Sequence, residues 1–450
     1  MPELTVRNWF GDLVSHPLVI VDAHSVADIQ AVLMDPSKYP APVRAAGSNH
    51  STTPCAAAEG GTLIRMKMNR ILNVGPDSLT VEAGATHIEM AKELERRGLQ
   101  FYVNTEIGSL TAGSAACAGT KDASMPGEFG QVGSYVAGVK MVLPGGELLE
   151  LTEAGQPERM RAVRSSYGTF GVVYEVTYRI RKLTPLAVHH RTYSIAEFLA
   201  ALPELKALGY SLMYYFFPFE DRITVEFRKD NPAASGEPNR TAWALRNHTW
   251  GTSGPRLAHE IGRHVHSPAI RYGIIDHFNG LWRLQLERFV ESDHTSPPDQ
   301  IIRYPESGSD NGYTFSLFAF PEADFPAALT DFVAFCKDYY AQEGYRSDLL
   351  YVGYWIAQDP KALLSYSSGG NVMTIDPVST GGPGWKEFLN AYNQFCVERN
   401  GLPLLNQTFG VTREIARKAF GSRLDEFAAA RRHYDPQGRL LNAYFQNLLG

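Results

Sequence analysis

The sequence GSLTAGSAACAGTK occupies residues 108–121, and twelve of these fourteen residues are Gly, Ala, Ser, Thr or Cys. A run of such small side chains cannot form a hydrophobic core by itself. It must therefore pack closely against another segment or lie along a ligand. The run lacks the GxxxxGK[ST] order of a P-loop and the GxGxxG order that opens a dinucleotide-binding helix. If it binds phosphate, it does so in a different architecture.

Two more glycine-containing segments lie next to predicted strands. RAAGSNHST at residues 44–52 follows a predicted strand and carries one histidine, His50. Its small residues let backbone N–H groups approach an anion, although by itself it fits an ordinary turn better. YGTFGVVYEVT at residues 167–177 places two glycines before a β-branched strand, and a tight turn explains that pattern equally well.

The chain around these segments divides into three parts, which together predict an α+β fold. Residues 1–185 alternate short apolar runs with helical patterns, and Pro144-Gly145-Gly146 is typical of a hairpin. Residues 186–404 have longer, aromatic-rich strands, which predict a second domain with an antiparallel sheet flanked by helices. Residues 405–450 begin after that sheet and include a helical stretch predicted over residues 412–434.

The composition excludes several classes of protein. The chain has 450 residues, 44% hydrophobic and 20% charged, which predicts two or three globular domains. A net charge of −6 argues against a nucleic-acid-binding or anionic-membrane surface. Four cysteines without a CxxC pair fit a reducing compartment. With no signal-peptide pattern and no apolar run of about 18 residues, we expect a cytoplasmic protein outside the membrane.

In their order and spacing, the three segments resemble the FAD-linked oxidases of the vanillyl-alcohol-oxidase/p-cresol-methylhydroxylase (PCMH-type) fold. The sugar-lactone and alditol oxidase branch is the most similar. The resemblance covers residues 14–185 and resumes at 427–444, FAAARRHYDPQGRLLNAY. It implies a PCMH-type FAD-binding domain over residues 1–185 and a substrate-binding cap over residues 186–404. Residues 405–450 would then return to the FAD-binding domain.

The resemblance also implies an activity. Such an enzyme transfers a hydride from the C–OH or C–NH carbon of a small molecule to flavin N5, and O2 is then reduced to hydrogen peroxide. His50 lies where family members bond an imidazole nitrogen to the flavin 8-methyl carbon, which implies covalent FAD. The alternative is a free histidine beside non-covalent FAD. Two other functions stay open: an FAD-dependent dehydrogenase with a non-oxygen acceptor, and a flavin-binding protein with a degraded active site.

The resemblance places cofactor contacts in all three segments. The spacing of Cys117 differs from that of relatives with a second covalent bond, so we expect a packed thiol. Lys121 stands where the branch usually has histidine, and it either compensates negative charge on the cofactor or is solvated. The expected cofactor-binding residues are His50, Ala45, Ala46, Gly47, Ser48, Asn49, Ser51, Ser109, Gly113, Ser114, Gly119, Thr120, Lys121, Val173 and Asn442.

The expected catalytic residues depart from the polyol-oxidising branch. That branch uses a Glu-x-Arg pair on a cap strand and a lysine near the C-terminus. Residues 348–355 lack the arginine, and Gln407 stands about where the lysine should be. A neutral, aromatic pocket favours an apolar or aromatic substrate over a polyol. We expect Asp348, Tyr351 and Gln407 near the reacting carbon, with Asp348 the only obvious base, although it fits an exposed strand-start carboxylate equally well.

Two other chemistries find no support in the sequence. His259 and His264 are five residues apart, so on a helix they point in different directions and cannot share a metal ion. A Ser-His-Asp hydrolase would need a GxSxG nucleophile turn, which is absent. We therefore expect no metal site and no hydrolytic triad.

Overall fold

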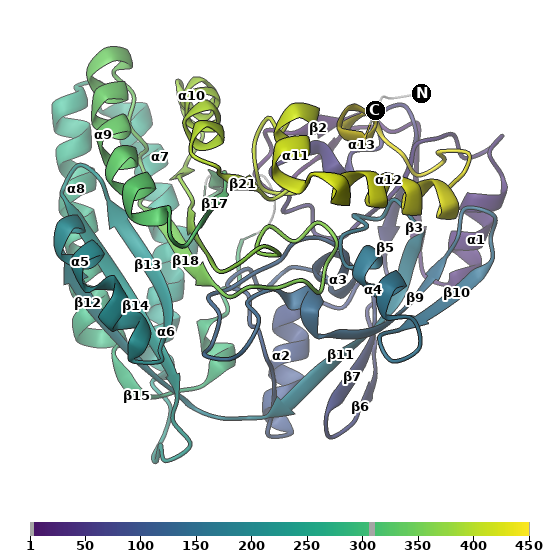
Figure 1. The fold of residues 1–450 in the computed structure, drawn as a ribbon, viewed down its shortest axis with the longest axis horizontal. Coiled ribbons are helices and arrows are strands. Elements are labelled where there is room, and N and C mark those ends of the chain that lie inside the picture. Colours follow the sequence, from purple (N-terminus) through teal and green to yellow (C-terminus); the bar gives the residue numbers. More distant parts are fainter. Residues whose placement is uncertain (1–3, 306–310, 450) are drawn as a thin grey trace.

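The computed structural model describes residues 4–305 and 311–449 of the chain. Figure 1 shows two lobes side by side. One lobe is an N-terminal domain that also receives the C-terminus, and the other is a cap formed by the middle of the chain. This is the predicted α+β architecture.

The N-terminal domain contains a parallel sheet, a larger antiparallel sheet and, near the start of the chain, a two-stranded antiparallel pair. Its strands are β1 (Val6–Arg7), β2 (Val14–Ser15), β3 (Val19–Ala23), β4 (Val43–Ala46), β5 (Thr62–Met66), β6 (Ile71–Val74), β7 (Ser78–Glu82), β8 (Leu99–Phe101), β9 (Val136–Val142), β10 (Leu148–Thr152) and β11 (Val172–Lys182). The parallel sheet has the order β3-β5-β4, and the antiparallel sheet has the order β10-β9-β11-β7-β6 with β8 pairing β11. The pairing of β9 with β10 confirms the hairpin predicted at Pro144-Gly145-Gly146.

Short helices from both ends of the chain cover these sheets (Figure 1). They are α1 (Val26–Met34), α2 (His87–Arg96), α3 (Ala112–Cys117), α4 (Pro157–Val163), α11 (Arg413–Phe420), α12 (Ser422–Tyr434) and α13 (Ala443–Leu449). The single helix predicted over residues 412–434 is wrong. Gly421 has a φ of +55°, a backbone conformation that ends α11 and separates it from α12.

The cap is an eight-stranded sheet between two layers of helices. Its elements are β12 (Leu186–Tyr193), α5 (Ile195–Ala207), β13 (Ser211–Phe217), β14 (Arg222–Asp230), α6 (Arg240–His248), α7 (Gly254–His264), α8 (Pro268–Gln285), β15 (Ser292–Thr295), β17 (Phe318–Pro321), α9 (Phe325–Glu343), β18 (Tyr351–Ile356), β19 (Val372–Ile375), α10 (Trp385–Glu398) and β21 (Leu402–Pro403). The strand order is β15-β12-β14-β13-β18-β19-β17-β21.

Strand β13 shows how the sequence fills both faces of this sheet. Tyr214 and Phe216 are buried in the core with α5, α9 and α10. Met213 and Tyr215, which alternate with them, are buried in the core with α6, α7 and α8. Successive side chains of a strand point to opposite faces, so a continuous apolar run is what a sheet covered on both sides requires.

One predicted strand is divided in the structure. The sequence pattern predicts a strand over residues 313–320, but the chain forms β16 (Thr314–Phe315), which pairs with β20 (Val378–Ser379), and then β17. Between them, the Ser316 hydroxyl accepts a hydrogen bond from the backbone N–H of Phe409. The Ser316 side chain at the break therefore binds the C-terminal segment, and the two strands do not join into one continuous strand.

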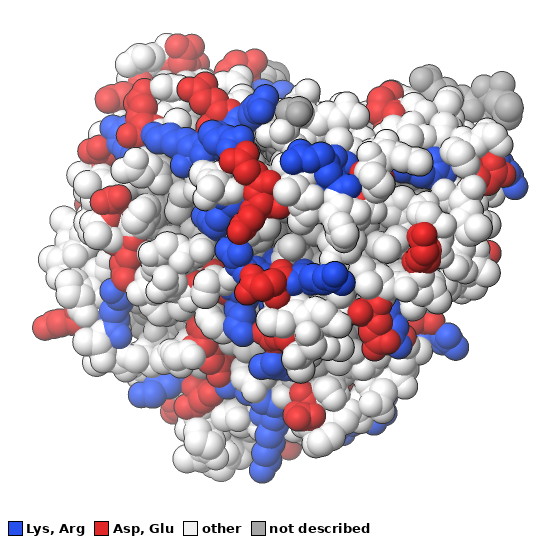
Figure 2. Space-filling view, turned by 45° about the vertical axis from the view of Figure 1, so that its right-hand side comes forward, with Lys and Arg blue, Asp and Glu red and all other residues white. Residues whose placement is uncertain are grey.

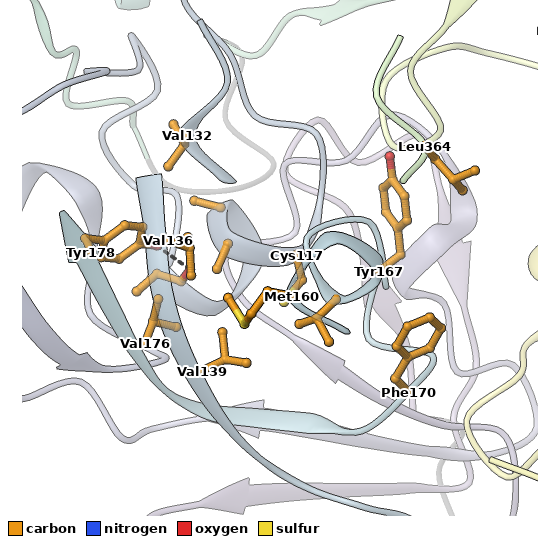
Figure 3. Close-up of a cluster of buried hydrophobic side chains, with 14 of the residues drawn as sticks. Cys117, Val132, Val136, Val139, Met160, Tyr167, Phe170, Val176, Tyr178 and Leu364 are labelled. Carbon is orange, nitrogen blue, oxygen red and sulfur yellow. Dashed lines mark hydrogen bonds between the residues drawn. The ribbon is translucent and has the colours of Figure 1, made fainter. Parts of the chain in front are cut away.

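A long connection between β18 and β19 ties the cap to the N-terminal domain. Leu363 and Leu364 are buried in the core of the N-terminal domain, and Figure 3 shows Leu364 next to Tyr167. The amide of Leu363 donates to the carbonyl of Arg161 at 2.9 Å. This part of the predicted cap range therefore packs on the other lobe.

The distribution of charge and of apolar helices bears on the classes of protein that the composition argued against. On the face drawn in Figure 2, basic and acidic side chains lie intermixed. Among the described residues, no helix is both long enough and apolar enough to cross a bilayer.

Candidate active site

A cavity with about 1060 Å³ of empty space, part of it open to solvent, lies where the loop at residues 44–51 meets α3. The wall combines the three glycine-containing segments with residues just after the last cap strand. The sequence-predicted residues in the wall are Ala45, Ala46, Gly47, Ser48, Asn49, His50, Ser51, Gly113, Ser114, Thr120, Val173 and Gln407.

Small residues are required where the first loop passes α3. A Cβ atom at Gly47 would lie 2.2 Å from the Thr111 hydroxyl oxygen and 2.6 Å from that of Ser114, so only glycine fits. Behind the loop, the buried Arg44 guanidinium donates to the carbonyls of Leu440 at 2.7 Å and Cys55 at 2.8 Å. One side chain thus holds the loop against the C-terminal segment.

We expect Gly47→Val to remove most of the flavin from the purified protein. The added side chain must displace Thr111 or Ser114, and both line the cavity. The ratio of flavin absorbance to protein absorbance measures the loss. Gly262→Val is the matched control, because a Cβ there meets nothing within 4 Å. Full flavin content in the Gly47 variant would show that this loop does not contact the cofactor.

His50 is placed as a neutral, oriented imidazole. Its Nε2 atom lies 2.6 Å from the Ser109 hydroxyl, and its ring stacks on Trp9 with centroids 5.0 Å apart. Burial lowers the pKa of His50 to about 4. The ring is therefore unprotonated at neutral pH, which is the nucleophilic form. Ser109 does not line the cavity itself but lies behind His50.

Besides Ser109, three of the expected cofactor residues lie outside the cavity wall. A Cβ at Gly119 would lie 2.2 Å from Leu404 Cδ1, so this glycine permits packing against the C-terminal segment. Lys121 forms an ion pair with Asp376 at 3.1 Å. Asn442 donates to the carbonyls of Pro54 and Ala57, which follow the His50 loop. None of these three residues lines the cavity.

Two of the three expected catalytic residues are also elsewhere. The Asp348 carboxylate accepts hydrogen bonds from the backbone N–H and the hydroxyl of Thr380 and from the Ser379 hydroxyl. Tyr351 stacks on Phe216 in the cap core, at a centroid distance of 5.1 Å. The Asp348 carboxylate and the Tyr351 ring are thus already engaged in contacts within the cap. Of the three expected catalytic residues, Gln407 is the one that lines the cavity.

The expected packed thiol at Cys117 agrees with the surroundings of this residue. Its side chain is buried among apolar residues of the N-terminal domain (Figure 3). Burial raises the pKa of Cys117 to about 11, so the thiolate is disfavoured.

Sequence reasoning missed Asn406, which lines the cavity beside Gln407. Its side-chain oxygen is buried and has no hydrogen-bond partner among the described residues. Such an orphaned acceptor is costly unless a ligand donates to it. Its only signal in the sequence was its place beside Gln407.

Glu106 was missed as well, although it is the nearest acidic residue before the small-residue run. Ile107 lines the cavity, and the Glu106 side chain is only 12% exposed. The carboxylate pairs with Arg246 on α6 and accepts a hydrogen bond from the Tyr354 hydroxyl at 3.4 Å. Both partners come from the cap, so no local sequence pattern could have revealed them.

Aromatic side chains cluster around His50, and two of them are close enough to Glu106 to sense its charge. The Tyr304 ring lies 6.2 Å from the His50 ring, and Tyr313 contacts both Trp9 and Tyr304. Burial raises the pKa of Tyr304 well above its usual value, with smaller contributions from Tyr313 and the Glu106 charge. The phenols are therefore neutral at physiological pH.

The cations near this region already have partners. Arg246 pairs with Glu106 and donates to the Tyr215 hydroxyl. The Lys121 ammonium lies 3.4 Å from the centroid of the Tyr354 ring and pairs with Asp376. Burial raises the pKa of Asp376 to about 6, against the opposing effect of Lys121.

The cavity fits FAD by its own features. The loop at residues 44–51 lines the cavity with mostly small residues, which leave its backbone accessible, and a Cβ at Gly47 would clash with Thr111 and Ser114. Asn406 offers an unpartnered acceptor, and His50 offers a neutral nitrogen. Backbone amides, an orphaned amide oxygen and an imidazole match a cofactor with a diphosphate and a polar ring edge.

Comparisons with known proteins agree with this fit. Residues 17–152 match the protein family described as FAD binding domain. An L-gulono-1,4-lactone dehydrogenase of Mycobacterium tuberculosis is 28% identical over 217 residues, which cover 48% of this chain and 50% of that protein. L-gulonolactone oxidase of Bos taurus is 24% identical over 224 residues, covering 49% and 50%. The chain thus spans about half the length of the curated relatives it matches.

Solved structures with the same fold cover the whole chain. A cholesterol oxidase from B. sterolicum has a TM-score of 0.77 at 14% identity, covering 100% of this chain and 97% of that one. A solvent-stable cholesterol oxidase has a TM-score of 0.76 at 17% identity, covering 100% and 98%. Residues 17–152 are therefore an FAD binding domain, in a chain that shares its overall fold with these cholesterol oxidase structures.

Proposed function

We propose that this protein is an FAD-dependent oxidase of a small apolar or aromatic-bearing alcohol. The substrate is oxidised to a carbonyl compound while O2 is reduced to hydrogen peroxide. The observation that carries this proposal is the position of Glu106, a nearly buried carboxylate whose neighbour Ile107 forms part of the cavity wall. The chemistry that FAD supplies when bound is hydride uptake from the alcohol carbon.

Glu106 has the features needed to hold the substrate hydroxyl and accept its proton. A carboxylate can accept both a hydrogen bond and a proton, and Arg246 fixes its orientation through an ion pair. The Tyr354 hydroxyl donates to its second oxygen at 3.4 Å, a long bond that a substrate hydroxyl can replace. Glu106 therefore takes the place that Asp348 and Tyr351 held in the sequence-based expectation.

The surroundings of His50 support a covalent attachment of the flavin to this residue. We infer that His50 bonds to the flavin, because its imidazole is neutral, buried and held by Ser109 and Trp9. Ala45 to Ser51 would hold the diphosphate with backbone N–H groups, while Asn406 and Gln407 would bind the polar edge of the flavin ring.

The substrate class follows from the charges and rings next to Glu106. A polyol requires several donors and acceptors, whereas Arg246 and Lys121 already have carboxylate partners. Tyr304 and Tyr313 offer aromatic surface instead. The relatives named for lactones match only half of their length, so their substrates do not transfer directly.

The test is anaerobic stopped-flow reduction of the flavin by a panel of alcohols. We expect faster bleaching of the oxidised flavin band by apolar or aromatic-bearing alcohols than by xylitol, sorbitol or an aldonolactone. Rapid bleaching by the polyols or lactone alone would contradict the substrate class but keep the activity. No bleaching by any compound would support a flavin-binding protein with a degraded site.

A dehydrogenase is the second candidate, because one of the matched relatives is named a dehydrogenase. Oxygen consumption separates the two functions. An oxidase consumes O2 and releases hydrogen peroxide during turnover, whereas a dehydrogenase turns over only when an artificial electron acceptor is added.

A further inference from the structure

Helix α8 carries apolar side chains on two opposite faces. Tyr272, Ile275 and Trp282 face the cap and are buried. The opposite face lies on the outer side of the cap, away from the N-terminal domain (Figure 1). The large apolar residues on this outer face are Ile270, Ile274, Leu281 and Leu284, which are 39–60% exposed.

These residues form a straight stripe along the helix. Together with the exposed His277 they recur at intervals of four and three residues, and we call this set the α8 stripe. That spacing is the one by which two helices pack along a common seam. No Asp, Glu, Lys or Arg lies within the stripe.

Two glycines flank the stripe inside the helix. A Cβ at Gly273 would meet nothing within 4 Å, and one at Gly280 would meet only Arg283 Nη2 at 3.7 Å. Glycine in a helix interior destabilises the helix relative to alanine. The packing of the cap gives no reason for either residue, whereas a second helix approaching closely would.

We propose that α8 is the interface of a two-fold symmetric dimer, in which α8 of a second copy lies antiparallel to it with the axis at His277. This axis places Leu281 of each copy against Gly273 of the other. It also places Ile274 of each copy against Gly280 of the other. On both sides of the axis, a large side chain of one copy thus lies in the notch that a glycine leaves in the other copy. The α8 surface is therefore complementary to itself, as a two-fold interface requires.

The apolar area is large enough for a weak dimer. Two more exposed apolar side chains lie nearby: Phe289, 65% exposed, in the helical turn that continues α8, and Leu245, 54% exposed, on α6, which contacts that turn. Six side chains of this size, about half exposed, amount to roughly 500 Å² in each copy. The pair would bury about 1000 Å² of apolar surface, near the lower limit for a specific interface. We therefore expect association in the micromolar range.

Sedimentation equilibrium of the flavin-loaded protein tests the dimer. The wild-type mass should rise from 49.8 kDa towards twice that value as the concentration increases through the micromolar range. Leu281→Glu should stay monomeric with unchanged flavin content. Leu18→Glu is the matched control, because Leu18 is 67% exposed on the other lobe. A wild-type protein that stays monomeric throughout would overturn the proposal.

A lipid surface is the main competing occupant, and the glycines separate it from a second copy. Gly273→Leu with Gly280→Leu enlarges the apolar face but fills both notches. The dimer should weaken at least tenfold in this variant, whereas binding to phosphatidylcholine/phosphatidylserine vesicles would strengthen if lipid were the occupant. Stronger vesicle binding without wild-type dimerisation would overturn the proposal.

Cross-linking tests the position of the axis. His277→Cys places two thiols against each other across it, and the four native cysteines are buried. Mild oxidation should give a covalent dimer on a non-reducing gel, and Leu18→Cys should not. Absence of the cross-linked species in a variant that still dimerises by sedimentation would refute an axis at this residue.

Discussion

Replacing Glu106 by Gln should slow flavin reduction by the preferred alcohol about 10²–10⁴-fold, the contribution expected of a positioned proton acceptor. The amide keeps the shape of the carboxylate but cannot take up a proton. Anaerobic stopped-flow spectroscopy measures the rate, and flavin absorbance should show unchanged cofactor content. Glu106→Asp should recover part of the rate, since it restores a carboxylate on a shorter side chain.

The same substitution removes the partner of a buried cation. Arg246 is 1% exposed, and leaving such a charge unpaired costs about 3–5 kcal/mol. Thermal unfolding of the variant must therefore accompany the rate measurement. Glu128→Gln is a milder control: it also takes a carboxylate from an arginine, Arg181, at 2.5 Å, but Arg181 keeps Asp230 at 3.4 Å as a second partner. A folded Glu106→Gln protein that is reduced at the wild-type rate would remove Glu106 from the mechanism.

His50→Ala should abolish the covalent flavin completely. Wild-type protein should stay yellow after acid precipitation, and its intact mass should exceed the chain mass by one FAD. The variant should lose its colour on precipitation, because no other nucleophile in the cavity wall combines exposure to the cofactor with a neutral, basic nitrogen. Cys117, one of the two thiols in the same wall, has its pKa raised to about 11 by burial.

Ser109→Ala gives a graded form of this test. The Ser109 hydroxyl lies 2.6 Å from His50 Nε2 and holds the ring in place. Its loss should slow attachment of FAD to the freshly folded protein without preventing it. His16→Ala, at a surface histidine, should attach FAD like the wild type. An adduct of unchanged mass in His50→Ala would place the bond on another residue.

The cavity proposed for the cofactor was largely predictable from sequence, because two short segments of local backbone build much of its wall. The loop at residues 44–51 and the run at residues 108–121 contain glycines at which a Cβ atom would clash with a neighbouring segment. Residue 47 must be glycine because Thr111 and Ser114, which belong to the second of these segments, lie too close for a Cβ atom. Where such segments bring backbone to a ligand, composition alone marks the contact.

The catalytic neighbourhood was not predictable, because its members come from different lobes. Asp348 was the obvious base on its strand, yet Thr380 and Ser379 already donate to it. In the sequence, Glu106 has no feature that sets it apart from other acidic residues. Its distinguishing contacts, with Arg246 and Tyr354, both come from the cap. A side chain's role as base or as structural acceptor depends on partners distant in the sequence.

The sequence by itself determined the α+β class and the position of the FAD-binding domain, since short-range patterns specify strands, turns and small-residue loops. Only the tertiary structure decided which charges remain available near the cavity. Lys121, expected at the cofactor, is held by Asp376, 255 residues away. The physical reason is that a buried charge must find a partner, and the fold, not the local chain, decides which partner is within reach.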